Sequence, residues 1–319
     1  MNKNSRVFVA GHRGLVGSAI QRRMEKSGYR NLITRSKTEL DLRNAEEVYR
    51  FFEDERPDYV FLSAAKVGGI YANNTYPADF IRDNLAIQMN VIHASYLSNV
   101  RKLLFLGSSC IYPKLAPQPM KEDYLLSGYL EPTNESYAIA KIAGMKMCEA
   151  YNRQYGTNFL SVMPTNIYGI NDNFDLNHSH VLPALIRKFH QAKQNGEPHV
   201  ELWGTGTPRR EFLFADDLAD ASVFLMENYD VNALNGFVNV GTGNDVTIFE
   251  LANLIKEIVG FDGDIIYDRN KPDGTPRKLL DVSKMNDLGW RAQTSLRDGI
   301  TMTYQWFGEQ MLNGSKVRI

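Results

Sequence analysis

The chain has 319 residues, with 36 Lys or Arg against 37 Asp or Glu, a net charge of −1 at pH 7. Its length allows a large core, so two domains, or one domain with a large insertion, are expected. The balanced charge argues against nucleic-acid and anionic-membrane partners, which need a basic field. Cys110 and Cys148 are the only cysteines, too few for a disulfide framework or a Cys-rich zinc site, and no metal is expected.

The first residues do not read as a targeting segment. Met1 to Arg6 is polar and short before the first strand-like run, and no stretch of about 18 apolar residues follows without a charge. We therefore expect a cytoplasmic protein that does not enter a membrane.

The first strand–turn–helix unit carries a glycine pattern. An apolar strand at 6–10 runs into a G-x-x-G-x-x-G turn, and a helix-like segment at 18–27 follows. In the dinucleotide-binding fingerprint, such glycines permit the tight turn and the close approach of the backbone to a pyrophosphate, which faces the helix N-terminus. The expected cofactor contacts in this turn are Gly11, His12, Arg13, Gly14, Leu15, Val16 and Gly17.

The residues after the second strand, at about 31–34, indicate which dinucleotide binds. An NAD site usually places an acidic residue there for the ribose 2′-hydroxyl. This chain has Arg35 and Lys37 instead, and Arg13 lies within the glycine turn. Cations at this point favour a 2′-phosphate and therefore NADP (as NADPH) over NAD, although a solvated basic turn is the plain alternative.

Strand-like and helix-like segments then alternate along the chain, which predicts an α/β fold. The class is a Rossmann-type doubly wound parallel sheet with a smaller, discontinuous α/β substrate domain. We expect an NADP-binding domain at 1–168 plus about 211–243, and a substrate domain at about 169–210 plus 244–319. Further strands are expected at 59–62, 103–106, 159–163 and 237–240, and helices at 45–52, 79–97, 135–155, 181–195, 216–228 and 247–259.

The stretch Gly107 to Pro113 (GSSCIYP) follows the fourth strand, at the carboxyl edge where open parallel sheets bind ligands. On an extended backbone, residues two apart point to the same side, so Ser108 and Cys110 could face one substrate together. The alternative is a small-residue loop whose hydroxyl caps the next turn.

Tyr137 and Lys141 lie four residues apart on the predicted helix at 135–155, so they share one of its faces. A phenol has a pKa of about 10 and donates a proton poorly at neutral pH until a nearby cation stabilises its phenolate. The pair is therefore a plausible proton donor, although taken alone it also fits an ordinary surface pair.

These motifs together resemble the extended short-chain dehydrogenase/reductases that act on nucleotide sugars. The stretches GHRG at 11–14, AKVGGI at 65–70, GSSCIYP at 107–113, Tyr137 to Gly144 and 271–281 are similar to those of the GDP-L-fucose synthase family, and the similarity runs from about Arg6 to Phe307. The resemblance implies conversion of GDP-4-keto-6-deoxy-D-mannose to GDP-L-fucose. C3 and C5 are epimerised first, and NADPH then reduces the C4 ketone.

The resemblance also implies the roles of five catalytic residues. Ser108 and Tyr137 donate hydrogen bonds to the enolate oxygen, and Tyr137 later protonates the C4 oxygen. Lys141 stabilises the phenolate and holds the nicotinamide ribose. Cys110 is the base and His180 the acid of epimerisation, since thiols and imidazoles titrate closer to neutrality than carboxylates do. Without the family, a space-filling Cys110 and a loop histidine at 180 would be favoured.

Further contacts follow from the same resemblance. The remaining cofactor contacts are expected at Arg35, Lys37, Asp41, Leu42, Leu106, Gly107, Lys141, Pro164, Thr165, Asn166, Ile167 and His180. Contacts to the GDP-sugar are expected at Lys188, Trp203, Arg210 and Asp273, with Arg277 and Lys278 nearby. Arginine and lysine suit a pyrophosphate, whereas Trp203 by itself fits a core aromatic as well.

The helix at 79–97 has two apolar faces, and a surface helix needs only one. This matches the four-helix bundle through which such enzymes dimerise, so a homodimer is expected. Three alternative functions stay open: a GDP-L-colitose synthase acting on the 3-deoxy analogue, a nucleotide-sugar 4-epimerase with bound NAD, and a non-catalytic NADP-binding protein.

Overall fold

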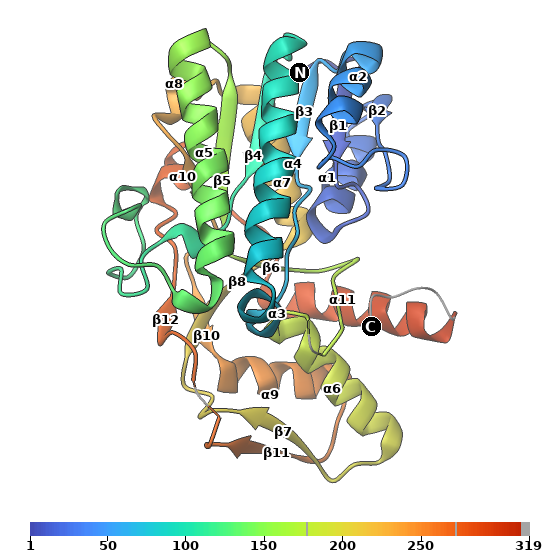
Figure 1. Cartoon of the computed structure of the whole chain (residues 1–319). Coiled ribbons are helices and arrows are strands. Elements are labelled where there is room, and N and C mark those ends of the chain that lie inside the picture. The colour runs from blue at the N-terminus through green and yellow to red at the C-terminus, as the bar shows by residue number, and fades with distance from the viewer. Residues whose placement is uncertain (177, 272, 314–319) are drawn as a thin grey trace.

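A computed structural model describes residues 1–176, 178–271 and 273–313. The larger part of the molecule is a parallel sheet of six strands in the order β2-β1-β3-β4-β5-β9 (Figure 1). These strands are β1 Arg6–Ala10, β2 Asn31–Ile33, β3 Tyr59–Leu62, β4 Lys102–Leu106, β5 Phe159–Pro164 and β9 Val238–Val240. Every residue of β4 and β5 is buried, which explains their continuous apolar sequences, since a central parallel strand is covered on both faces.

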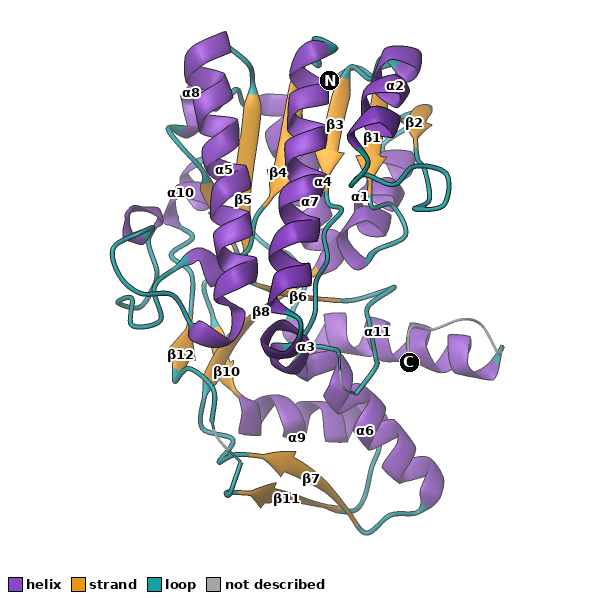
Figure 2. Cartoon of the chain, in the orientation of Figure 1, coloured by secondary structure: helices purple, strands orange, loops and turns teal. Residues whose placement is uncertain are grey.

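Helices cover both faces of this sheet (Figure 2). One face carries α2 Ala45–Glu55, α4 Pro77–Leu97 and α5 Glu135–Tyr155, and the other carries α1 Leu15–Lys26 and α7 Ala215–Asn228. Each layer forms its own core: residues such as Phe52, Val91 and Met145 pack on one face, and Ile20 and Leu218 on the other. The predicted doubly wound α/β class is confirmed.

A second, smaller unit lies beyond the carboxyl edge of the sheet, at the bottom of Figure 1. Its larger sheet joins β10 Asp245–Thr247, β8 Arg209–Phe214 and β12 Arg277–Lys278, with β6 Asn166–Tyr168 also paired to β8. A two-stranded sheet pairs β7 His199–Trp203 with β11 Asp264–Asp268. Helices α6 Val181–Asn195, α9 Ile248–Val259 and α11 Leu296–Leu312 build a third core with these strands.

Most predicted elements lie within a few residues of the observed ones, and α5 and α6 match at both ends. The sequence analysis did not predict the 17-residue helix α11. It also missed the short helices α3 Ile70–Thr75, α8 Val231–Leu234 and α10 Ser283–Asp287, and the two-residue β12. Such elements are too short to show a periodic pattern, and tertiary contacts fix them instead.

The backbone after β4 differs from the extended form assumed above. Ser108 is extended, with φ −162°, but Ser109–Ile111 forms a 3₁₀ turn. The Ser108 hydroxyl accepts a hydrogen bond from the Cys110 N–H at 3.4 Å and so caps this turn. Ser108 and Cys110 are therefore brought together by a capped turn rather than by strand alternation.

The predicted domain boundaries stay a proposal. The pairing of the strands and the packing of the cores cross these boundaries in two places. The proposed 1–168 plus 211–243 unit includes β6 and most of β8, which pair with each other in the second sheet. The proposed 169–210 plus 244–319 unit includes Met285 and Trp290, which pack in the core of the first unit. The chain therefore crosses between the two units more often than the sequence pattern indicates, and 314–319 lie outside the described residues.

The fully buried carboxylate of Glu211, on β8, holds three segments together. Its Oε1 accepts hydrogen bonds from the N–H groups of Thr242 at 2.6 Å and Gly243 at 2.7 Å, in the turn after β9. Its Oε2 accepts one from the N–H of Leu280 at 3.0 Å, just beyond β12. The Glu211 carbonyl oxygen also accepts from the Asn166 side chain on β6 at 2.8 Å, and the bonds from the turn after β9 link this second unit to the large sheet.

Replacing Glu211 with glutamine should destabilise the fold. The amide nitrogen of Glu211→Gln cannot accept a hydrogen bond and would face buried N–H groups, at a cost of about 1–3 kcal/mol in the free energy of unfolding. Urea denaturation followed by circular dichroism measures this cost. Glu46→Gln is the matched control, because the Glu46 side chain is 81% exposed and surface changes cost little. Equal urea midpoints for the two variants would contradict this role of Glu211 as a clamp, that is, as the buried acceptor that joins β8 to the turn at 242–243 and to Leu280.

Candidate active site

A cleft of about 700 Å³ lies at the carboxyl edge of the large sheet, where the two units meet. Nearly all of the predicted cofactor contacts line it, together with four of the predicted catalytic residues. The lining includes Gly11, Gly14, Leu15, Val16, Gly17, Arg35, Lys37, Asp41, Leu42, Leu106, Gly107, Ser108, Tyr137, Lys141, Pro164, Thr165, Asn166, Ile167 and His180. His12, Arg13 and Cys110 lie outside this lining, His12 and Arg13 in the glycine turn beside it.

The glycine turn has the close packing that a dinucleotide-binding turn requires. Gly11 has a φ of +87°, and a Cβ there would lie 2.8 Å from the Ala64 backbone nitrogen. A Cβ on Gly17 would collide with the Gly11 carbonyl oxygen. The Gly14 N–H donates to Gly11 at 2.9 Å and closes the turn. The residues present therefore fit a pyrophosphate held at the start of α1.

The cation expected to meet a 2′-phosphate is preorganised. The Arg35 guanidinium donates to the Thr34 carbonyl oxygen at 2.8 Å, pairs with Glu55 and lies 5.5 Å from the centroid of the Phe51 ring. It lines the cleft together with Lys37, whereas Arg13 is exposed. Two cations therefore border the cleft at the end of β2.

Asp41, an expected cofactor contact, is bound by Arg43 at 2.6 Å, which lowers the pKa of this carboxyl to about 2. Arg43 begins a charge network that the sequence analysis missed. Lys66 binds Asp79 at 2.9 Å and lies 3.6 Å from Asp83, and Arg82 binds Asp83 at 2.8 Å. All five of Arg43, Lys66, Asp79, Arg82 and Asp83 line the cleft. The position of Lys66 just after β3, at the carboxyl edge, was the signal that could have indicated it.

Ser108, Tyr137 and Lys141 meet at the inner end of the cleft. The buried Lys141 ammonium donates to the Leu106 carbonyl oxygen at 2.7 Å and lies 5.8 Å from the centroid of the Tyr137 ring. The phenol and the ammonium are thus neighbours, with the ammonium anchored to the end of β4. The Ser108 hydroxyl oxygen accepts a hydrogen bond from the Cys110 N–H at 3.4 Å, and hydrogen bonding by this hydroxyl lowers the pKa of both the Tyr137 phenol and the Cys110 thiol.

Burial dominates the titration of these groups. It raises the pKa of the Tyr137 phenol and the pKa of the Cys110 thiol, and it lowers the pKa of Lys141 to about 8. In the absence of ligands the phenol is therefore a protonated donor at neutral pH. The lysine keeps its charge only below about pH 8.

His180 immediately precedes α6 and reaches the cleft from the second unit. It is open to solvent within the cleft, yet the surrounding protein lowers its pKa, and the charge of Lys278 lowers it further. Lys278 acts on the Cys110 thiol as well, so the proposed acid and base of epimerisation lie in the field of one cation.

The predicted substrate contacts all belong to the second unit, and none of them is among the residues that line the cleft. Lys188 donates to the Glu201 carbonyl oxygen at 3.1 Å, and burial lowers its pKa. Trp203 is 66% exposed, as a recognition residue would be and a core aromatic would not. Asp273 accepts from the Thr205 N–H at 2.9 Å. Arg277 is already engaged within the protein, because its guanidinium is bound to the buried carboxylate of Asp245.

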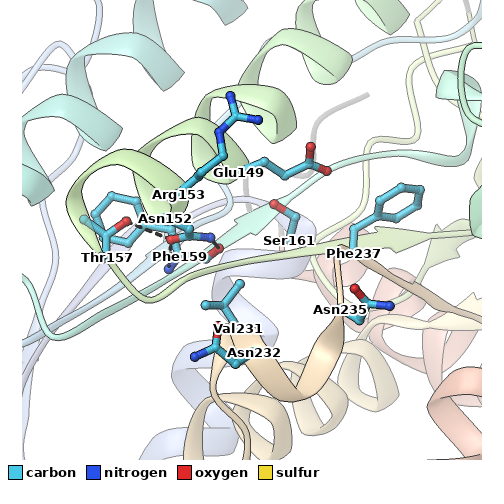
Figure 3. Close-up of a pocket in the computed structure, with 12 residues that line it drawn as sticks. Glu149, Asn152, Arg153, Thr157, Phe159, Ser161, Val231, Asn232, Asn235 and Phe237 are labelled. Carbon is cyan, nitrogen blue, oxygen red and sulfur yellow. Dashed lines mark hydrogen bonds between the residues drawn. The ribbon is translucent and has the colours of Figure 1, made fainter.

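A second hollow of about 370 Å³ lies at the opposite, amino end of β5 (Figure 3). The Asn152 side chain in it is engaged at both ends of its amide, because it accepts from the Phe159 N–H at 2.9 Å and from Thr157 at 2.7 Å and donates to the Phe159 carbonyl oxygen at 2.9 Å. None of the predicted catalytic or cofactor residues lines this hollow. The candidate chemistry is confined to the carboxyl edge.

A Rossmann sheet, a glycine turn and a Ser–Tyr–Lys set at the end of one cleft define a short-chain dehydrogenase/reductase of the extended type. The family model for the NAD-dependent epimerase/dehydratase family matches residues 7–241, and the chain belongs to this family. GDP-L-fucose synthase 1 of Arabidopsis thaliana is 59% identical over 98% of this chain and 96% of its own length. GDP-L-fucose synthase of Escherichia coli is 57% identical over 95% of this chain and 97% of its own length.

One solved structure bears a name that agrees with these relatives. A GDP-L-fucose synthetase from Naegleria fowleri bound to NADP is 28% identical, covers 100% of this chain and 98% of its own, and superposes with a TM-score of 0.91. Among the relatives compared by sequence, a GDP-L-colitose synthase from Yersinia pseudotuberculosis is more distant. It is 39% identical over 95% of this chain and 97% of its own length. The predicted resemblance to GDP-L-fucose synthases is confirmed, and the colitose enzymes are the less similar group.

The buried ammonium of Lys141 should leave a signature in the pH dependence of stability. The folded state releases this proton near pH 8, whereas the unfolded state keeps it to about 10.5, so the unfolded state binds more protons in between and stability rises with pH. Between pH 8 and 10.5 the wild type should gain roughly 3 kcal/mol relative to Lys141→Met. Urea denaturation at a series of pH values measures the difference. If the unfolding free energies of wild type and Lys141→Met stayed parallel between pH 8 and 10.5, the lowered pKa of Lys141 would be refuted.

Proposed function

We propose that this protein converts GDP-4-keto-6-deoxy-D-mannose to GDP-L-fucose by epimerising C3 and C5 and then reducing the C4 ketone with NADPH. The observation that carries the proposal is that Ser108 lines one cleft with Tyr137 and Lys141 while its hydroxyl caps the turn that carries Cys110. The relatives named GDP-L-fucose synthase, similar over nearly the whole chain, support it.

The cofactor would lie along the cleft. The glycine turn and the start of α1 would hold its pyrophosphate, and Arg35 with Lys37 would hold the 2′-phosphate, which favours NADPH over NADH. Lys141, anchored at Leu106, would hold the nicotinamide ribose. When bound, the cofactor supplies a hydride.

In the reduction, Tyr137 donates its phenolic proton to the C4 oxygen. Burial keeps that proton on the phenol at neutral pH, and the Lys141 ammonium beside the ring stabilises the phenolate left behind. Ser108 donates a hydrogen bond to the same oxygen. The oxygen is thereby held in place and its developing charge is stabilised.

In the epimerisation, Cys110 removes the hydrogen next to the ketone and His180 delivers a proton to the opposite face. The ketone oxygen takes the enolate charge between Ser108 and Tyr137, so both halves of the reaction share one pair of donors. Cys110 comes from the first unit and His180 from the second, and this origin in two different units supports a base and an acid acting on opposite faces of the sugar.

Two substitutions should separate the two reactions. Cys110→Ser should abolish exchange of solvent deuterium into C3 and C5, because a serine hydroxyl is far less acidic than a thiol, while reduction of the unepimerised ketone survives. Tyr137→Phe should lower NADPH oxidation by about 10²–10⁴-fold, the usual contribution of a general acid, and leave exchange detectable.

Mass spectrometry of the sugar and absorbance of NADPH give the two readouts. The keto-sugar and its 3-deoxy analogue should be compared, with NADPH and NADH, in the wild type. Preference for the 3-deoxy sugar would select the colitose reaction instead. Undiminished reduction by Tyr137→Phe would exclude the catalytic assignment.

We further propose a homodimer in which α4 and α5 of two copies form a four-helix bundle. The two helices pack side by side on one face of the sheet (Figure 1). They present exposed apolar side chains, Met89 and Leu97 on α4 and Ile139 and Tyr155 on α5. Both cysteines are free, as expected in a reducing compartment such as the cytoplasm, which is the proposed location.

A charge placed on that face should dissociate the dimer. Met89→Glu would bury a carboxylate in an apolar contact, so light scattering should give half the mass of the wild type. Leu312→Glu is the control, since Leu312 is exposed at the far end of α11 and should leave the mass unchanged. A monomeric wild type would refute the proposed dimer.

A further inference from the structure

The segment between β3 and α3, the β3 loop, is fastened to the first unit by two buried asparagines. The Asn84 side chain, on α4, accepts from the Lys66 N–H at 2.9 Å and donates to the Lys66 carbonyl oxygen at 2.9 Å. The Asn73 side chain, on α3, donates to the carbonyl oxygens of Gly68 at 2.7 Å and Gly69 at 3.0 Å. The main chain of the β3 loop is therefore fixed relative to the large sheet.

The β3 loop touches the second unit at its last residue, Gly69. The Gly69 N–H donates to the His178 carbonyl oxygen at 2.9 Å. A Cβ on Gly69 would lie 2.6 Å from the Ser179 carbonyl oxygen, and its next two neighbours are main-chain atoms of Ser179 and His178 at 3.5 and 3.6 Å. Gly69 has a φ of −67°, which any residue adopts. The close approach of Ser179, and not the backbone conformation, is therefore what requires a glycine here.

The segment that Gly69 meets leads directly into His180, the proposed acid of epimerisation. Asp175 holds this segment in a turn. Its carboxylate accepts from the His178 N–H at 2.9 Å and lies 2.8 Å from the His178 ring, and its carbonyl oxygen accepts from the Ser179 N–H at 2.8 Å. His180 then begins α6, where its carbonyl oxygen accepts from the Ala184 N–H at 3.2 Å. His178, Ser179 and His180 all line the cleft, so a displacement of Ser179 reaches His180 over one peptide unit.

The reductase set lies away from this contact. Lys141 is anchored to the carbonyl oxygen of Leu106 at the end of β4. The Phe80 ring, which packs edge-on against Tyr137 with ring centroids 6.2 Å apart, lies beside Gly68. The three atoms nearest to a Cβ on Gly69 all belong to the second unit. A Cβ there would press on the segment before His180 and not on the proton donor of the reduction.

We propose that Gly69 is a positioning residue of the epimerisation, which sets the place of His180 in the cleft by letting the second unit approach the β3 loop to hydrogen-bonding distance. The inference rests on the proposed function, in which His180 delivers the proton that inverts the carbon. Reduction at C4 takes its proton from Tyr137 and does not need His180 as an acid. Gly69 therefore serves one of the two reactions and leaves the other in place.

Gly69→Ala tests this role through the ratio of two products. The new Cβ must move from 2.6 Å to at least 3.4 Å from the Ser179 carbonyl oxygen, and the fixed β3 loop leaves the segment before His180 to yield. Misplacement of a catalytic group by about 1 Å can cost about 10²-fold. The ratio of reduced sugar inverted at C3 and C5 to reduced sugar that is not inverted should fall by about 10- to 100-fold. Nuclear magnetic resonance of the product sugar measures it.

Gly308→Ala is the matched control, because a Cβ at Gly308 on α11 meets no atom within 4 Å. It should keep the wild-type ratio. Loss of folded protein lowers both products alike, so an unchanged ratio in Gly69→Ala would overturn the role, whatever the total activity. Should Gly69→Ala fail to fold, Asn73→Ala replaces it. That variant frees the Gly69 carbonyl oxygen without adding a Cβ there, and the same fall or constancy of the ratio decides.

The imidazole signal of His180 gives a second readout, without substrate. In protein with isotope-labelled histidines, six in the chain, the His180 signal is identified by its loss in His180→Asn. It should move in Gly69→Ala and stay in place in Gly308→Ala. A His180 signal that does not move in folded Gly69→Ala would also overturn the role. If the wild type does not convert the GDP-sugar, the proposed function fails, and the His180 signal still decides the role of Gly69.

Discussion

The structure depends on one buried carboxylate. Glu211 is fully buried. Its carboxylate accepts hydrogen bonds from three main-chain N–H groups that are far from it in the sequence, two in the turn at 242–243 and one at Leu280. Unmatched N–H groups at such a site would cost more than the hydrogen bonds contribute when present. The clamp therefore fixes β8 against β12 and against the end of the large sheet. It sets where Arg210 and Lys278 lie relative to the cleft.

The same clamp explains how a discontinuous second unit can complete a site begun in the first. The first unit supplies a rigid edge, with the glycine turn, the capped 3₁₀ turn at Ser109–Ile111 and the start of α5. The second unit supplies His180, which lines the cleft just before α6. Preorganisation of this kind favours reactions in which charge develops on a single oxygen.

Much of the fold could be predicted from the sequence, because apolar runs mark buried parallel strands and the glycine spacing marks the first turn. The helix with Tyr137 and Lys141 was predicted at both ends, since its small and apolar residues are periodic. The orientation of Arg277 and Lys278 could not be predicted, because a two-residue strand has no period and its faces are set by pairing with β8. The clamp by Glu211 and the network of Lys66 with Asp79 and Asp83 were missed for a similar reason. Their partners are distant in sequence, and only the fold brings them together.

The origin of the two epimerisation residues has a mechanical consequence. Cys110 is carried by the first unit, whereas His180 precedes a helix of the second. The reductase set of Ser108, Tyr137 and Lys141 lies wholly in the first unit. Small changes in the spacing of the units would therefore alter the distance between base and acid while leaving the reductase set intact. In such an architecture, one of two reactions in a shared cleft can be altered through the contacts between the units, without a substitution at either reacting centre.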